Sequence, residues 1–230
     1  IDNLEKYHLE WIIDHHKFNL QTVSPLNIRA EGLASTASVL YKMYVENDLQ
    51  ITKDIACLML AGIVSDTLYF RSPTTTDIDK QIAYELNKIA KIDDLEKFSL
   101  EMFDAKSDLS EFSAEEIVEM DYKTFQINEN KISIGVIETT NPKFSLDKSE
   151  EIKAVLSKLK EENNLLASFI FVVDIINEES IGICISDKEE SILRGSFKQT
   201  KDLGEGLISI GNVLSRKKEM VPAIETYLTS

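Results

Sequence analysis

The sequence contains few residues that bend or cross-link a chain. Its 230 residues include 8 glycines, 4 prolines and 2 cysteines. The glycine content is about half of the usual ~7%, and the sequence contains no glycine-rich phosphate loop. Cys57 and Cys184 lie within apolar runs, so we expect buried free thiols in a cytoplasmic protein rather than a disulfide framework. No apolar run approaches the ~18 residues of a membrane-spanning helix, so we expect no membrane segment.

Positive charge is also scarce. The chain carries 25 Lys and Arg residues against 40 Asp and Glu residues, which gives a formal net charge of −15. Such a surface repels phosphate backbones, so we expect no nucleic acid partner. Basic residues are nevertheless concentrated in the basic window, residues 191–218, where six of them accompany two acidic residues. This window could bind a small anion, although most charge runs are simply solvated.

Strand and helix patterns alternate along the first half of the chain. An apolar run that includes Trp11, Ile12 and Ile13 predicts a short buried strand. Apolar residues at helical spacing then predict helices over residues 35–44, 55–68, 76–89 and 95–103. The third of these helices begins with Thr76 and Asp79, which match a capping box.

The second half of the chain predicts a mixed α/β unit. Strand patterns cover residues 132–138, 168–176 and 181–186, and a long amphipathic helix lies between the first two at about 147–163. Residues 104–114 are polar and have no clear period, which indicates a domain boundary. We therefore expect a first domain over residues 1–105, a linker over 106–114 and a second domain over 115–230.

The first predicted strand ends in Asp14, His15 and His16. One carboxylate and two imidazoles in a row are hard to explain by packing at the end of a buried strand. In an open α/β sheet, ligands bind at this edge. Histidine and carboxylate together suit divalent transition metals. We therefore interpret this group as a metal or phosphate site. The third histidine of the chain, His8, is expected to be an ordinary surface residue.

Three further segments are weak signals when each is taken alone. Asp66 interrupts an apolar helix, where a carboxylate is costly to bury unless it is paired or bound to a metal. An N-cap or a buried salt bridge explains Asp66 equally well. The run Ser-Arg-Lys-Lys at residues 215–218 could bind phosphate, because Arg offers a planar fork and Lys a compact charge. Such basic runs usually lie at the surface, and Lys123 is unremarkable by itself.

Taken together, these residues resemble the manganese-dependent (family II) inorganic pyrophosphatases of the DHH phosphoesterase superfamily. Asp14-His15-His16 is similar to the superfamily signature. Residues 65–74, Ser-Asp-Thr-Leu-Tyr-Phe-Arg-Ser-Pro-Thr, are similar to the family's downstream metal motif. Residues 215–218, followed by Val221-Pro222, are similar to its C-terminal substrate motif. The resemblance implies an α/β fold, with a parallel-sheet DHH domain that is incomplete here and a smaller mixed-sheet domain that binds substrate.

The resemblance also implies a metal site. His15 and Asp66 would bind the ions, with Asp66 bridging two of them. Asp14 would hold His15 in place without binding an ion itself. The cofactor would be Mn²⁺, as two or more divalent ions, with Co²⁺ or Mg²⁺ as alternatives. Two such ions lower the pKa of a bridging water and clamp the reacting phosphate.

The substrate site implied by the resemblance draws on both domains. His16 would contact the substrate phosphate, and Lys123, Arg216 and Lys217 would bind phosphate oxygens from the second domain. Closure of one domain onto the other would assemble the site in a cleft between them. The partners would be pyrophosphate and phosphate, and the enzyme would be a cytoplasmic homodimer.

The sequence departs from the family pattern at its start. The family carries a His-x-x-x-Asp-x-Asp motif and a strand-end Asp upstream, and neither is present. The sequence also lacks an initiator Met, so we expect it to be the remainder of a longer chain, and an inactive fragment is one alternative. The other is a DHH-type phosphodiesterase for short oligonucleotides or cyclic dinucleotides. Such enzymes typically carry a Gly-Gly-Gly-His-type motif, whereas this chain has no Gly-Gly pair and no histidine after His16.

Overall fold

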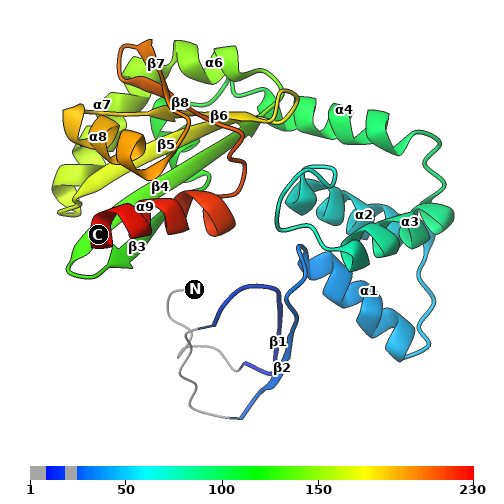
Figure 1. Cartoon of the computed structure of the whole chain (residues 1–230). Helices are drawn as coiled ribbons and strands as arrows, with labels where there is room; N and C mark the ends of the chain where they lie inside the picture. The colour runs from blue at the N-terminus through cyan, green and yellow to red at the C-terminus, as the bar shows by residue number, and fades with distance from the viewer. Residues whose placement is uncertain (1–8, 19–24) are drawn as a thin grey trace. The chain divides into compact units, whose positions relative to one another are not determined.

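The computed structural model describes residues 9–18 and 25–230, so His8 lies outside the described residues. The chain forms two compact units, Ile1–Ser99 and Leu100–Ser230, and each is described by itself (Figure 1). The boundary between them falls inside helix α4 (Leu95–Ser107). It therefore precedes the linker expected at 106–114, which contains the end of α4, a short loop and the start of α5 (Ala114–Glu119).

The first unit contains a short parallel strand pair. Strand β1 (Trp11–Asp14) pairs with β2 (Asn27–Ala30), and the register places Asp14 opposite Ala30. The predicted strand is confirmed as β1, but its predicted burial is wrong, because Trp11 is 55% exposed and Ile28 on the neighbouring β2 is 53% exposed. What the pair does provide is a shared carboxyl end, at which the chain leaves β1 directly into the two histidines.

Helices pack together in the rest of the first unit. The predicted helices are confirmed as α1 (Thr36–Glu46), α2 (Lys53–Thr67), α3 (Asp77–Ala90) and α4. Helices α1 and α2 pack closely at Gly62, where an added Cβ would lie only 3.3 Å from the Cβ of Ala37. The packed interior of this unit includes fully buried apolar side chains from three helices: Val39, Leu60, Ile63, Ala83 and Leu86.

Asp79 connects α3 to the loop that follows β2. The predicted capping box is confirmed, because the Asp79 backbone N–H donates to the Thr76 side chain and the Asp79 carboxylate accepts from the Thr76 backbone N–H. The same fully buried carboxylate also accepts from the Ala34 N–H at 3.0 Å and from the Ser38 hydroxyl at 2.6 Å. One acidic side chain therefore fixes both the start of α1 and the start of α3.

Replacing Asp79 with alanine should destabilise the first unit strongly. Three segments would lose their shared acceptor, and their buried donors would be left unsatisfied, so we expect a loss of about 3–4 kcal/mol in the free energy of unfolding. Urea denaturation followed by circular dichroism measures this loss. Asp77→Ala is the matched control, because Asp77 is exposed in the same helical turn. Equal effects of the two substitutions would contradict the assigned role of Asp79.

The second unit is built on a six-stranded mixed sheet with the order β3-β4-β5-β6-β8-β7. Strands β4 and β5 are parallel, and the other neighbouring strands are antiparallel. This domain was expected to be the smaller one, yet its sheet is the larger of the two described. The strands are β3 (Tyr122–Ile127), β4 (Asn130–Thr139), β5 (Ala167–Asp174), β6 (Glu179–Ile183), β7 (Lys201–Gly204) and β8 (Leu207–Gly211).

Helices cover both faces of this sheet, so β5 is buried along its whole length. On one face, Ile170 and Val172 of β5 pack in a core cluster with residues of α5 and α7. On the other, the ring of Phe171 contacts Phe197 at the end of α8, and α9 crosses in front of β3 and β4 (Figure 1). The remaining helices are α6 (Pro142–Asp147), α7 (Ser149–Glu162), α8 (Asp187–Ser196), the π-helical turn η2 (Arg216–Met220) and α9 (Val221–Thr229). In the described part of the chain, every helix is too short or too polar to cross a membrane.

Candidate metal and phosphate site

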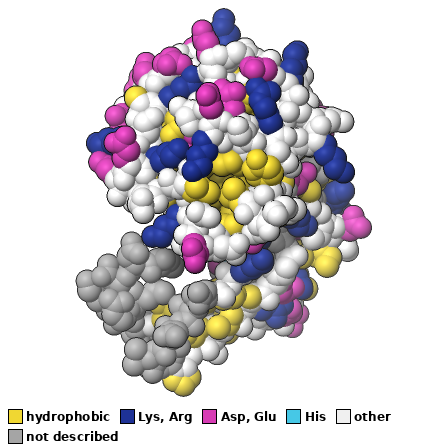
Figure 2. All heavy atoms as spheres, turned by 60° about the vertical axis from the view of Figure 1, so that its left-hand side comes forward, with side chains coloured by type: hydrophobic (Ala, Val, Ile, Leu, Met, Phe, Trp, Pro, Cys, Tyr) yellow, Lys and Arg dark blue, Asp and Glu magenta, His cyan; other side chains and the backbone are white. Residues whose placement is uncertain are grey.

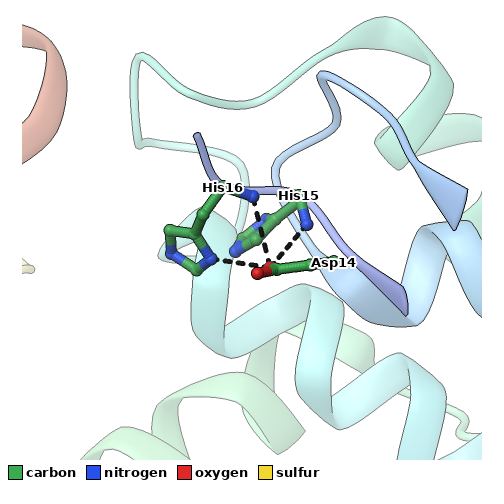
Figure 3. A group of neighbouring side chains, drawn as sticks. All are labelled: Asp14, His15 and His16. Carbon is green, nitrogen blue, oxygen red and sulfur yellow. Dashed lines mark hydrogen bonds and ion pairs between the residues drawn. The ribbon is translucent and has the colours of Figure 1, made fainter. Parts of the chain in front are cut away.

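Asp14, His15 and His16 form a compact group at the carboxyl end of β1. One ligand atom from each residue can be chosen so that all three lie within 4.8 Å of one another. Figure 3 shows the carboxylate and both imidazole rings gathered where the strand ends. The two rings meet edge to face, with centroids 4.1 Å apart. Because the three residues are consecutive and follow a strand, the local backbone is enough to bring them together.

The Asp14 carboxylate organises this group through one oxygen. Its Oδ1 accepts the backbone N–H of His15 at 2.6 Å and that of His16 at 3.2 Å. The same oxygen lies 2.8 Å from Nδ1 of the His16 ring (Figure 3). The expected support of His15 by Asp14 therefore runs through the His15 backbone, and the ring that Asp14 orients is that of His16.

The environment keeps Asp14 ionised. Burial is the largest single influence and raises the pKa of its carboxyl. The hydrogen bonds from the His16 ring and from the two backbone N–H groups outweigh burial and lower this pKa below its ordinary value. A carboxylate with two imidazoles beside it is a nitrogen and oxygen donor set that suits divalent first-row metals. The residues present therefore fit a metal ion such as Mn²⁺.

Asp66 lies in the last turn of α2 and is exposed. The burial cost from which its function was inferred is therefore absent, and Asp66 is not part of the three-residue group above. The backbone that follows is unusual, since Leu68, Tyr69 and Phe70 all adopt positive φ angles of 50°, 50° and 68°. Conformations of this kind persist where the surroundings impose them. A metal site that joins Asp66 to His15 stays a prediction.

Thr67 stabilises this left-handed turn. Its buried hydroxyl donates to the Ile63 carbonyl oxygen at 2.6 Å and accepts the Phe70 N–H at 3.2 Å. The Ser72 N–H in turn donates to the Thr67 carbonyl oxygen at 2.9 Å. The segment directly after Asp66 is thus held by hydrogen bonds to the end of α2.

The second unit brings two of the predicted phosphate-binding cations to one carboxylate. Arg216 donates from Nη2 to Oδ1 of Asp121 at 2.8 Å. Lys123, on β3, places its Nζ 3.4 Å from the same oxygen. Lys217 directly follows Arg216 in η2 and is exposed. The sequence did not single out Asp121, because nothing in its local pattern links it to a residue 95 positions away.

One other cation of the basic window, Arg194, is paired with acidic neighbours. Arg194 donates to Glu190 at 3.3 Å and to Asp202 at 2.8 Å, so this cation is largely neutralised by its neighbours. On the face drawn in Figure 2, basic and acidic side chains are interspersed. An anion site in this window, around Arg216, stays a prediction.

Comparisons with known proteins show the family of this chain. Family models match twice: the DHH family N-terminal domain at residues 1–63, and the DHHA2 domain at residues 100–227. The manganese-dependent inorganic pyrophosphatase of Bacillus subtilis is 36% identical over 225 residues, which cover 97% of this chain and 72% of that protein. The protein of the same name from Methanocaldococcus jannaschii is 37% identical over 233 residues, with 97% and 74% covered. The chain belongs to the manganese-dependent inorganic pyrophosphatase family.

A solved structure supports this membership at the level of the fold. The crystal structure of a Methanococcus jannaschii protein described as a family II inorganic pyrophosphatase superposes with a TM-score of 0.84. It is 32% identical, and the match covers 100% of this chain and 76% of that one. The resemblance stated from the three motifs is thereby confirmed, as is the expected α/β fold class.

Proposed function

We propose that this chain is a hydrolase that cleaves inorganic pyrophosphate into two phosphates with Mn²⁺ as its cofactor. The observation that carries the proposal is the Asp14-His15-His16 group in a member of this family. Its donor chemistry suits a divalent ion, and the relatives named above are manganese-dependent pyrophosphatases. The donor chemistry of the group and the names of the relatives therefore support the same metal, and the relatives support the enzyme class and the substrate.

The first unit would supply the metal-binding side of the reaction. His15 and Asp66 would hold the metal, in a site for two divalent ions. When bound, these ions supply Lewis-acid activation of a water molecule and neutralise charge on the phosphate. Asp14 keeps His16 in place, because its carboxylate accepts from Nδ1 and leaves Nε2 as the ring nitrogen available to the substrate phosphate. The site thus needs Asp14 as an ionised acceptor.

The second unit would supply the cations. Arg216, Lys123 and Lys217 would offset the charge of pyrophosphate and orient it for in-line attack. The proposal requires that one substrate molecule contact both His16 and these cations during turnover. The homodimer and the cytoplasmic location stay predictions.

The test compares the hydrolysis of three compounds. With Mn²⁺ present, the chain should release orthophosphate from pyrophosphate and should leave a linear dinucleotide and a cyclic dinucleotide intact. Removal of the metal with a chelator should stop the release, and added Mn²⁺ should restore it. Hydrolysis of a dinucleotide without hydrolysis of pyrophosphate would overturn the substrate assignment. Hydrolysis of none of the three compounds would support an inactive fragment.

A further inference from the structure

We propose that Asp121 is a positioning residue that sets which edge of the Arg216 guanidinium is presented to the substrate phosphate. This inference rests on the proposed pyrophosphatase function. Asp121 lies in the turn between α5 and β3, outside the three motifs by which the family resemblance was identified. Its role follows from the contacts that it makes with Arg216.

Asp121 binds Arg216 through both its side chain and its backbone. Its Oδ1 accepts from Nη2 at 2.8 Å, and its carbonyl oxygen accepts from Nη1 at 2.7 Å. Nη1 also donates to the Ile134 carbonyl oxygen on β4 at 3.2 Å. With these three acceptors around it, the Arg216 side chain is only 13% exposed. The guanidinium is therefore docked against the start of β3 and against β4.

Some N–H donors of the Arg216 guanidinium remain for a ligand. A guanidinium carries five N–H groups in a planar fork. Within the described residues, Nη1 donates to two protein acceptors and Nη2 to one, so we assign Nε and the second proton of Nη2 to the ligand. These two donors lie on one edge of the fork and can bind two oxygens of a phosphate together. Asp121 thus determines which edge of the Arg216 guanidinium faces the substrate phosphate.

The backbone of Arg216 is fixed independently of Asp121. The Ser215 hydroxyl caps η2 by accepting the Lys218 N–H at 3.3 Å. The Glu219 carboxylate accepts the Ser215 N–H at 2.9 Å. Since the main chain is held by these contacts, a change at Asp121 should alter the orientation of the side chain rather than the path of the backbone.

Asp121 also lies next to a second cation. Its Oδ1 is 3.4 Å from Nζ of Lys123, so one carboxylate oxygen serves both positive groups. Two cations brought to one phosphate repel each other, and an anion between them lowers that cost. Both side chains of this second pair are exposed, so the main effect of Asp121 should fall on Arg216.

The first test is a double-mutant cycle on pyrophosphate hydrolysis. Asp121→Ala should lower kcat/KM by roughly ten- to a hundredfold, because Nη2 loses its carboxylate acceptor while the two backbone carbonyls still bind Nη1. Asp121→Asn keeps an oxygen acceptor for Nη2 and should retain activity to within about threefold. In an Arg216→Ala background, Asp121→Ala should cost little more. Glu119→Ala, an exposed change at the end of α5, should leave kcat/KM unchanged. Equal losses from Asp121→Ala with and without Arg216 would overturn the proposal.

A second readout does not depend on turnover. The chain has four arginines, so the Nε–Hε signal of Arg216 can be assigned in an NMR spectrum from its loss in Arg216→Lys. Inorganic phosphate should shift this signal in the unsubstituted chain, and Asp121→Ala should broaden the signal and reduce the shift. An unchanged signal in Asp121→Ala would overturn the role of Asp121 even if pyrophosphate is hydrolysed. Absence of hydrolysis together with the expected phosphate shift would instead contradict only the proposed function.

Discussion

Replacing His15 with alanine should abolish Mn²⁺-dependent pyrophosphate hydrolysis. His15 is the ring in the three-residue group that is proposed to bind the metal directly, and an alanine cannot replace its nitrogen. Loss of a residue that only orients a ligand typically costs 10–100-fold in metal affinity, so loss of the ligand itself should cost at least about a hundredfold. Mn²⁺ titration under equilibrium conditions measures the loss of metal affinity, and orthophosphate release measures the loss of hydrolysis.

The controls for this prediction come from its neighbours. Lys17→Ala changes an exposed residue two positions away and should leave both metal affinity and activity unchanged. His16→Ala should retain Mn²⁺ affinity better than His15→Ala, because His16 is assigned to the substrate. Wild-type metal affinity in His15→Ala would remove His15 from the metal site.

Replacing Arg216 with alanine should lower kcat and kcat/KM together, by roughly ten- to a thousandfold. The guanidinium would supply a charge-assisted contact to phosphate, and its two remaining donors lie on one edge. If that contact forms mainly in the transition state, both kinetic constants fall by the same factor. Steady-state kinetics with pyrophosphate at saturating Mn²⁺ provide the measurement.

Arg194→Ala is the matched control for Arg216→Ala. It removes the same charge from the same basic window, but Arg194 is exposed and is paired with Glu190 and Asp202. We expect an activity within about twofold of the unsubstituted chain, since exposed ion pairs contribute little. If the two arginine variants lost activity equally, the effect would come from net charge, and the specific role of Arg216 would be wrong.

The helices and the central strands could be predicted because their signals are local. Apolar spacing predicted helices α1 to α4, and the pair Thr76 and Asp79 predicted the start of α3. Strands β4, β5 and β6 were found because they are buried and apolar. Strand β7 is short and exposed along its whole length, so no alternation of apolar and polar residues marks it. Its pairing with β8 comes from a tight turn and not from a hydrophobic pattern.

In the candidate site too, contacts between residues close in sequence could be predicted, and contacts between distant residues could not. Asp14, His15 and His16 are consecutive, so their proximity could be predicted from the end of one strand. The interaction of Asp121 with Arg216 depends on how β3, β4 and η2 come together, and no single segment of the sequence contains that information. Asp79 falls between these cases, because its capping role was predicted and its bond to Ala34 was not.

The central claim is that His15, at the end of β1, binds Mn²⁺, and pulsed electron paramagnetic resonance tests it most directly. Mn²⁺ bound to the chain should show a hyperfine coupling to a histidine ¹⁴N nucleus. Labelling the histidines with ¹⁵N should replace this coupling with a ¹⁵N coupling. His15→Ala should remove the coupling, while Lys17→Ala should retain it. Bound Mn²⁺ without any histidine coupling, or a coupling that persists in His15→Ala, would contradict the account.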